Sequence, residues 1–294
     1  MIVCFGSINL DLIFPLPALP QRGQTVLGQA MHVEPGGKGA NQAVAAARDG
    51  ARVLFAGAVG ADAFADQALA TLRAAGVELS RVVAADTSTG CAAICVDAEG
   101  NNQIAVASGA NLLARADQVE DALLGPGTTL LLQGESDLDE TAALIHRARA
   151  GGARIVLNLA PAAKLDAAAL RAVDVLVLNE DEAAAVAARF LTEGNAIRLH
   201  EALGVAVIVT LGERGAQAAG AEGHCRLPAH PVTVVDTTAA GDCFTGVLAS
   251  ALDRGLSLAD AMRRAGVAAA LCCSRAGSQG SLPLAAETDA ALAG

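Results

Sequence analysis

Residues 234–252 carry the sequence VVDTTAAGDCFTGVLASAL, which changes from extended to helical character within a few positions. The leading valines favour a strand, the small residues that follow favour a tight turn, and the apolar spacing after Gly241 predicts a helix. The free backbone amides of a first helical turn point out in front of the helix, where the helix dipole favours negative charge. This stretch therefore predicts an anion hole that could hold a phosphoryl group.

Asp242 lies in the same turn, where its carboxylate could accept a proton from an attacking hydroxyl. A simpler interpretation is that the threonines and the aspartate only cap the helix. The stretch alone does not decide between the two.

The rest of the chain alternates between strand-like and helix-like segments. Alanine-rich segments with helical spacing cover residues 40–49 and 62–75, and each is followed by glycine, the usual left-handed cap. Continuous runs rich in Val, Ile and Leu predict strands that are covered on both faces. These runs are Met1–Ile8, Arg52–Val59, Thr129–Gln133, Arg154–Leu159, Asp174–Leu178 and Ala206–Thr210. The pattern predicts an α/β fold with a mostly parallel sheet, whose ligands bind outside the carboxyl ends of the strands.

Two regions interrupt the alternation. Residues 12–33 contain three prolines and then a strand-like segment, Thr25–His32, whereas residues 89–106 predict a hairpin with its turn at Asp97–Asn101. Both regions stand where an α/β layer would need a helix. We expect one domain over residues 1–294, with a small β-sheet from about residues 12–34 and 88–108 that acts as a lid.

Residues 35–42, PGGKGANQ, open a predicted helix. The spacing matches neither a P-loop nor a dinucleotide-binding motif. Glycines let the backbone approach a ligand closely, and Lys38 and Asn41 could bind hydroxyl groups. A plain glycine-rich turn before a helix is the alternative.

Two further polar groups follow predicted strands. Asn179 and Glu182 lie three residues apart at the start of a helix and could order Mg²⁺ through water, although acidic residues there also suit the helix dipole. Asn9 and Asp11 alternate onto one face at the end of the first strand, where polar groups usually meet a ligand or a cap.

Composition excludes several classes of function. The formal charge is −11 and there is no Trp or Tyr, which argues against nucleic acid as a partner. No run is long and apolar enough to span a membrane, and the first twelve residues favour a buried strand over a signal peptide. Seven cysteines without a CxxC pair predict reduced thiols in the cytoplasm, and five scattered histidines without HExxH make a catalytic zinc site unexpected.

Taken together, these blocks resemble the ribokinase family of carbohydrate kinases. The matching blocks occur in the family's order over nearly the whole chain: GSINLD, GGKGANQAVAAAR, STG (88–90), GAN (109–111), NLAPA (158–162), NEDEA (179–183), TLGERGA (210–216) and DTTAAGDCFTG. The resemblance implies a three-layer α/β/α domain with a β-sheet lid, often shared across a homodimer interface. It also implies ATP-dependent phosphorylation of the exocyclic hydroxymethyl oxygen of a small furanose, with D-ribose as the expected substrate.

The resemblance assigns roles by position. It makes Asp242 the catalytic base and places the anion hole at the amides of Ala239, Ala240 and Gly241. The sugar-binding positions are Asn9, Asp11, Gly37, Lys38, Gly39, Asn41, Glu135 and Asp242. The nucleotide-binding positions are Asn179, Thr210, Leu211, Gly212, Glu213, Arg214, Gly215, Gly241 and Gly266. Glu182 would order Mg²⁺, and Asp236, Thr238, Cys272, Arg275, Gly277 and Ser281 would bind an activating K⁺ or similar cation, mostly through backbone carbonyls.

Other interpretations stay open at this point. A kinase of the same fold could act on deoxyribose, another pentose or a nucleoside, but a nucleoside base would need an apolar or aromatic slot, and the chain has only six Phe as aromatic residues. A non-catalytic sugar-binding sensor would more naturally lack the aspartate or the glycine turn. A nicotinamide dehydrogenase is disfavoured because GxGxxG is absent.

Overall fold

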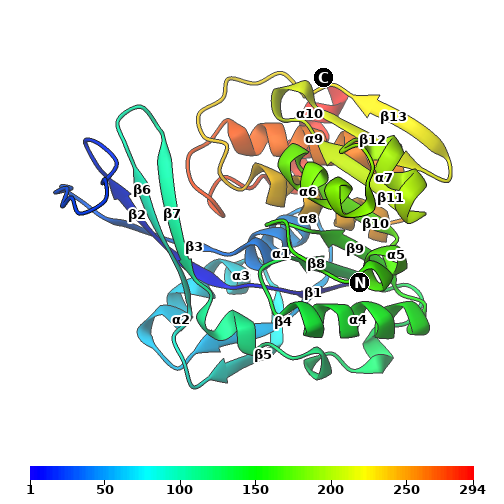
Figure 1. The fold of residues 1–294 in the computed structure, drawn as a ribbon, viewed down its shortest axis with the longest axis horizontal. Coiled ribbons are helices and arrows are strands. Elements are labelled where there is room, and N and C mark those ends of the chain that lie inside the picture. Colours follow the sequence, from blue (N-terminus) through cyan, green and yellow to red (C-terminus); the bar gives the residue numbers. More distant parts are fainter.

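The computed structural model describes all 294 residues and has a nine-stranded sheet between two layers of helices (Figure 1). The strand order is β13-β12-β11-β10-β9-β8-β1-β4-β5, and all neighbours are parallel except β11–β12 and β12–β13. The strands are β1 (Ile2–Phe5), β4 (Val53–Gly60), β5 (Glu78–Ala85), β8 (Thr129–Gln133), β9 (Arg154–Asn158), β10 (Val175–Leu178), β11 (Ala206–Thr210), β12 (Ala216–Gly220) and β13 (Gly223–Leu227).

The helices segregate by face. One face is covered by α1, α3, α8 and α9, and the other by α4, α5, α6 and α7. The α-helices are α1 (Lys38–Arg48), α2 (Ala63–Ala68), α3 (Ala70–Ala74), α4 (Leu138–Gly151), α5 (Ala167–Ala172), α6 (Glu180–Phe190), α7 (Ala196–Leu203), α8 (Ala240–Asp253), α9 (Leu258–Cys273) and α10 (Ala285–Ala293). Short 3₁₀ turns are η1 (Gly109–Leu113), η2 (Ala116–Gln118), η3 (Asp121–Leu123) and η4 (Gly212–Arg214).

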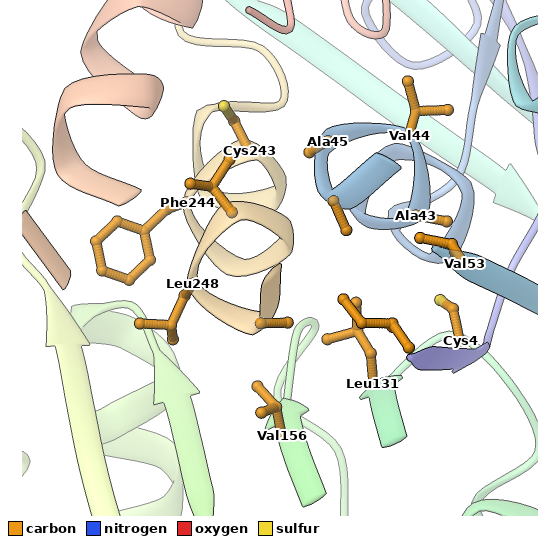
Figure 2. Close-up of a cluster of buried hydrophobic side chains, with 14 of the residues drawn as sticks. Cys4, Ala43, Val44, Ala45, Val53, Leu131, Val156, Cys243, Phe244 and Leu248 are labelled. Carbon is orange, nitrogen blue, oxygen red and sulfur yellow. The ribbon is translucent and has the colours of Figure 1, made fainter. Parts of the chain in front are cut away.

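Side-chain alternation along the strands builds the two halves of the core. In β1, Ile2 and Cys4 pack toward α1 and α8, whereas Val3 and Phe5 pack toward the opposite helices. Figure 2 shows Leu131 and Val156 of neighbouring strands directed toward α8 and α1. Because helices cover both faces of the sheet, the central strands consist of almost continuous apolar residues, as the sequence predicted. The three-layer α/β/α expectation is confirmed.

A second sheet of four strands projects from the main body (Figure 1). Its order is β3-β2-β6-β7, and we call it the small sheet. The strands are β2 (Asn9–Pro15), β3 (His32–Gly36), β6 (Gly90–Val96) and β7 (Asn102–Ala107). The β6–β7 hairpin has the turn that the sequence indicated, since Gly100 N donates to Asp97 O at 3.1 Å.

The structure differs from the sequence-based expectations at four places. Thr25–His32 is not a strand, because β3 begins only at His32. The predicted helix over 62–75 is two short helices, α2 and α3, which meet at Leu69. Val234 and Val235 are mostly exposed and form no strand, so the α8 turn follows a loop. Asn9 and Asp11 lie on β2 of the small sheet and not at the end of β1.

None of the helices combines the length and the apolar character that crossing a membrane requires.

Candidate active site

The candidate site lies at the carboxyl edge of the main sheet. The chain runs from β1 outward to β4 and β5 and later returns to add β8 on the other side of β1, so the strand order reverses between β1 and β8. Ligands of open α/β sheets bind at such a reversal, outside the carboxyl ends of the strands. Ser7 follows β1, and Glu135 follows β8 by two residues. The polar residues discussed below gather around this point.

Asn9 and Asp11 are on the same face of β2, as the sequence predicted. Asn111 Nδ2 donates to Asn9 Oδ1 at 2.7 Å, and Ile8 N donates to Asn111 Oδ1 at 2.9 Å. The oxygen and the nitrogen of the Asn111 amide therefore both have a hydrogen-bond partner. The bond to Asn9 also uses Asn9 Oδ1 as its acceptor. The Nδ2 group of Asn9 makes no hydrogen bond within the protein and remains available as a donor.

The glycine block fits against these residues so closely that side chains are excluded. A Cβ on Gly36 would lie 2.1 Å from Asp11 Oδ2, and one on Gly39 would lie 2.5 Å from Ser7 N. Gly37 has φ +88°, a conformation that L-residues rarely adopt, and caps the start of α1. The glycines thus allow close packing of the loop against β2 and the end of β1.

Glu135 is anchored at the centre of this edge. Its Oε2 accepts hydrogen bonds from Ser7 Oγ at 2.6 Å and from the backbone amide of Lys38 at 3.0 Å. Ser7 Oγ in turn accepts from Gly39 N at 3.2 Å. Glu135 therefore binds the start of α1 to the end of β1, and only its second oxygen remains uncommitted.

The electrostatics of the site are dominated by carboxylates. Burial, and then repulsion from Glu135, Glu34 and Asp242, raise the pKa of Asp11 to about 7. Attraction from Asp242 raises the pKa of Lys38 against the opposing effect of burial, and Glu135 adds to the increase. The ammonium of Lys38 forms no ion pair and no hydrogen bond within the protein. It is a positive charge held near the carboxylates and free to bind an anionic or hydroxylated ligand.

Asp242 is buried in the first turn of α8, with 7% of its surface exposed. Its two oxygens each accept one amide hydrogen from successive residues of α1. Asn41 Nδ2 donates to Oδ2 at 2.9 Å, and Gln42 Nε2 donates to Oδ1 at 3.0 Å. The structure contradicts the simpler interpretation that Asp242 serves only as a helix cap. Its carboxylate accepts hydrogen bonds from side chains of α1 and none from the backbone amides at the start of α8.

The turn before α8 contains one residue in an uncommon backbone conformation. Ala239 has φ +59°, which is uncommon for a residue with a side chain. Of the predicted anion-hole amides, that of Ala240 donates to Thr237 O at 3.2 Å, whereas those of Ala239 and Gly241 make no hydrogen bond within the protein. The amide of Asp242 is also free. The N-terminus of α8 thus offers several donors beside the carboxylate.

The candidate nucleotide-binding residues lie at the ends of β10 and β11. Asn179 and Glu182 form a reciprocal capping box at the start of α6: Glu182 N donates to Asn179 Oδ1, and Asn179 N donates to Glu182 Oε2, both at 2.8 Å. Burial raises the pKa of Glu182, and its other oxygen has no protein partner. A buried carboxylate that forms no ion pair within the protein fits water-mediated binding of Mg²⁺.

The segment Thr210–Gly215 leaves β11 through the η4 turn and enters β12. Gly215 has φ +85°, and a Cβ there would lie 2.0 Å from Leu227 O. Gly266 on α9 is the opposite case, since a Cβ there would meet no atom within 4 Å. The space beside Gly266 is therefore open.

The candidate cation loop is formed by two segments that come together. Asp236 accepts from Thr238 N and Oγ1 at 2.9 and 2.7 Å and from Gly277 N at 3.0 Å, and these bonds lower its pKa although burial opposes them. Cys272 Sγ lies 3.7 Å from Thr238 O and 3.0 Å from Ser281 Oγ. Oxygen atoms of Thr238 and Ser281 thus lie beside the Cys272 thiol, where the two segments meet.

Arg275 is one of the residues predicted to bind the monovalent cation, but its side chain is directed toward α10 and away from the loop. It forms an ion pair with Glu287 of α10 at 2.5 Å, and its backbone amide donates to Cys272 O at 3.1 Å. Only a backbone contribution from Arg275 is therefore compatible with the loop.

Sequence reasoning did not single out several residues that the structure brings to the site. They are Ser7, Glu34, Gln42, Asn111, Gln133, Asn158 and Gln279. Ser7, Gln42, Asn111 and Asn158 lie inside blocks that carried the resemblance, and a buried amide at such a position was the available signal.

Comparison with known proteins agrees with this geometry. The family model of the pfkB family carbohydrate kinases matches residues 1–285, and the chain belongs to this family. It is accordingly a carbohydrate kinase, a phosphotransferase whose acceptor is a sugar hydroxyl. Among its relatives, a ribokinase of Bacillus subtilis is 35% identical over 301 residues, which cover 99% of both chains.

Solved ribokinases have the same fold. The ribokinase of Thermotoga maritima superposes with a TM-score of 0.91 at 31% identity, covering 100% of this chain and 99% of the other. The Arabidopsis thaliana ribokinase complexed with ribose and ATP has a TM-score of 0.88 at 27% identity, covering 99% of this chain and 98% of the other.

Proposed function

We propose that this protein is an ATP-dependent sugar kinase that phosphorylates the 5-hydroxymethyl oxygen of D-ribose to ribose 5-phosphate. The observation that carries the proposal is the position of Asp242. Its carboxylate is buried, is held through both oxygens by α1, and lies in the same turn as the free amides of α8. A base and an anion hole side by side are what transfer of a phosphoryl group to a hydroxyl requires. The full-length similarity to ribokinases supports ribose as the acceptor.

In the proposed mechanism the residues of this chain position the sugar and stabilise the charge on the transferred phosphoryl group. Asn9, Asp11 and Lys38 bind the ring hydroxyls of the sugar, and Asp242 aligns the primary hydroxyl and accepts its proton. Because the transition state of phosphoryl transfer is loose, most of the catalysis comes from positioning and charge stabilisation. The free amides at the start of α8 would stabilise the charge on the transferred group.

ATP is the proposed phosphoryl donor, bound at Asn179, the segment Thr210–Gly215 and the open space at Gly266. When bound, Mg²⁺ neutralises charge on the phosphates, and we assign its ordering through water to Glu182. We assign an activating K⁺ or similar cation to the loop of Asp236, Thr238 and Cys272, together with the backbone of the 275–281 segment.

We further propose that residues 1–294 act as one domain in which the small sheet closes over the sugar. The sugar residues Asn9 and Asp11 lie on β2 of that sheet, so its movement and sugar binding would be linked. The exposed apolar residues Ile104 and Val106 on β7 of the small sheet support a homodimer formed through it. Seven free cysteines are consistent with a proposed cytoplasmic location.

The proposal is tested by coupled ADP release with ATP and Mg²⁺ against ribose, deoxyribose, fructose, adenosine and no sugar, each with and without potassium. We expect ribose to give the highest kcat/KM and potassium to raise the rate. Higher kcat/KM with deoxyribose or adenosine would reassign the substrate. Measurable ribose binding by calorimetry without any turnover would instead support a sensor.

A further inference from the structure

The donors that hold Asp242 are themselves held by a second pair of amides. Gln133 Nε2, at the end of β8, donates to Gln42 Oε1 at 2.9 Å. Gln279 Nε2, in the loop before α10, donates to Asn41 Oδ1 at 3.0 Å. Two chains of amides therefore converge on the catalytic carboxylate. One runs from Gln133 through Gln42 to Oδ1, and the other from Gln279 through Asn41 to Oδ2.

The direction of both chains is dictated by their shared end. An ionised carboxylate only accepts hydrogen bonds, so Asn41 and Gln42 must turn their NH₂ groups toward Asp242. Their amide oxygens then face outward and need donors in turn. Gln42 is fully satisfied, because its Nε2 also donates to Asn158 Oδ1 at 2.9 Å. The inner residues of both chains therefore have bonds on both sides.

The outer glutamines are not satisfied in this way. Gln133 Oε1 and Gln279 Oε1 are buried and have no hydrogen-bond partner in the protein. The residues are 2% and 1% exposed, and Gln133 Oε1 lies so close to Gly6 that a Cβ on that glycine would be 2.0 Å away. A buried amide oxygen without a partner is unfavourable for stability, and such groups are rare enough to require a reason.

Rotating either outer amide by half a turn would not relieve this cost. It would bring the oxygen of Gln133 against the oxygen of Gln42, or the oxygen of Gln279 against that of Asn41, and would remove the donor that each inner amide needs. The fold thus keeps two buried acceptors unpaired while both NH₂ groups are directed into the chains that end at Asp242.

We propose that Gln133 and Gln279 are positioning residues of the phosphoryl transfer, which act through Gln42 and Asn41 to fix the Asp242 carboxylate for the sugar hydroxyl. This inference rests on the proposed role of Asp242 as the base. Because the outer amides do not touch the carboxylate itself, their contribution to the transfer is to its orientation. Without the NH₂ group of Gln133 or Gln279, the amide of Gln42 or Asn41 can rotate and turn its oxygen toward Asp242. The two oxygens repel each other, and the carboxylate of Asp242 moves out of position.

The test replaces each outer glutamine by methionine, which has a similar length but no donor. In Gln133→Met and Gln279→Met we expect kcat with ribose to fall roughly 10- to 100-fold, as for small misplacements of a catalytic group, while KM for ribose changes less than about threefold. The melting temperature is expected to change little, because one unpaired buried oxygen is removed while the oxygen of Gln42 or Asn41 loses its donor. A residue with a structural role alone would show the reverse, a lower melting temperature with kcat retained.

Ser250→Ala is the matched control. Ser250 Oγ is another buried atom without a partner, on α8 and two turns beyond Asp242. Its removal leaves no other group without a partner, so it should keep or raise the melting temperature and leave kcat unchanged. Gln279→Glu adds a second signature, since a carboxyl can donate to Asn41 only when protonated. Its kcat relative to the wild type should therefore recover as the pH is lowered.

The outcomes distinguish a failure of the positioning role of Gln133 and Gln279 from a failure of the proposed role of Asp242 as the base. Unchanged kcat in both methionine variants, together with an inactive Asp242→Asn, would overturn the inference and leave the proposed function standing. An active Asp242→Asn would instead overturn the proposed base. A fall in kcat that is accompanied by a large fall in the melting temperature would assign the glutamines to folding and also overturn the inference.

Discussion

The carboxylate of Glu34, on strand β3 of the small sheet, accepts a hydrogen bond from the backbone amide of Ser278 at 2.9 Å and lies 3.3 Å from the hydroxyl of the same residue. Ser278 lies in the loop that we assign to the monovalent cation, and its hydroxyl also donates to Pro35 O at 2.9 Å. The small sheet and the cation loop are therefore joined directly. The bond is between residues 244 positions apart in the chain.

This contact should be visible in hydrogen exchange. In Glu34→Ala the amide of Ser278 loses its acceptor, so deuterium uptake in a peptide covering residues 275–281 should become faster. Glu34→Gln keeps an acceptor and should have a smaller effect. Glu99→Ala, at the exposed β6–β7 turn, is the control for loss of a carboxylate elsewhere on the small sheet. Equal uptake in Glu34→Ala and the wild type would show that other bonds hold the loop.

Asp242→Asn should abolish most turnover and keep the fold. Both carboxylate oxygens are acceptors, so an asparagine must turn its NH₂ group toward one of the two donor amides and cannot take the hydroxyl proton. We expect kcat to fall roughly 10²- to 10⁴-fold, measured by coupled ADP release. Circular dichroism and the exposed-site variant Asp117→Asn serve as controls. Turnover near the wild-type value would contradict the assignment.

The raised pKa of Asp11, about 7, predicts pH dependence of both binding and stability. The ionised carboxylate can accept two hydroxyl hydrogens, so KM for ribose should rise as the pH falls below 7. In the folded protein the group holds its proton between its ordinary pKa of 3.8 and 7, where the unfolded chain has lost it. Stability from this group is therefore full below pH 4 and is lost as the pH rises through 7.

The variant Asp11→Asn removes both effects. It should be more stable than the wild type at pH 8, on the order of 2 kcal/mol, and no more stable at pH 4. Urea unfolding at the two pH values measures this difference, and the pH dependence of KM should flatten in the same variant. A constant stability difference between pH 4 and pH 8 would contradict the raised pKa.

Gly36→Ala should impair sugar binding more than catalysis. The added Cβ would lie 2.1 Å from Asp11 Oδ2 and must push that side chain away, whereas Asp242 is held from α1 and stays in place. We expect KM for ribose to rise about tenfold or more, with a smaller change in kcat. Gly125→Ala, where a Cβ would meet no atom within 4 Å, is the control. Unchanged KM would show that Asp11 does not bind the sugar.

The proposed homodimer makes a prediction about mass in solution. Ile104 and Val106 on β7 are 55% and 53% exposed, and a second copy would cover them. Light scattering after gel filtration should give twice the chain mass for the wild type. Ile104→Asp should shift the mass toward that of one chain, and Leu191→Asp, at an exposed residue on the main body, should not. A wild-type protein that elutes as a single chain would contradict the proposal.

The sequence predicted the centre of the fold better than its periphery. Strands such as β8 and β11 consist of buried Val, Leu and Ile and could be recognised from the apolar run alone. Strand β5 is half exposed, and β12 is made of Ala, Gly and Gln, so neither carries a strong local signal. Residues 25–31 are strand-like in sequence but pair with no strand, because pairing depends on which neighbouring segment is available as well as on local sequence.

The candidate site could be predicted as separate blocks but not as a network. Asp242, Asn41 and Lys38 stand in glycine-rich segments that are specific enough to recognise. The bond from Gln279 to Asn41 joins residues 238 positions apart, and no local pattern reports a contact of that range. Glu34 was not predicted for the same reason, since its partner lies at the other end of the chain.

Gly37 is the one residue between strand β3 and helix α1. The strand contributes the backbone beneath Asp11, and the helix presents the two amides that hold Asp242. An engineer who grafts the small sheet of a relative onto this chain, in order to change the accepted sugar, would also replace the segment that sets the angle of α1. Such a chimera should therefore exchange residues 32–42 as one unit, because specificity and turnover are inherited together through this junction.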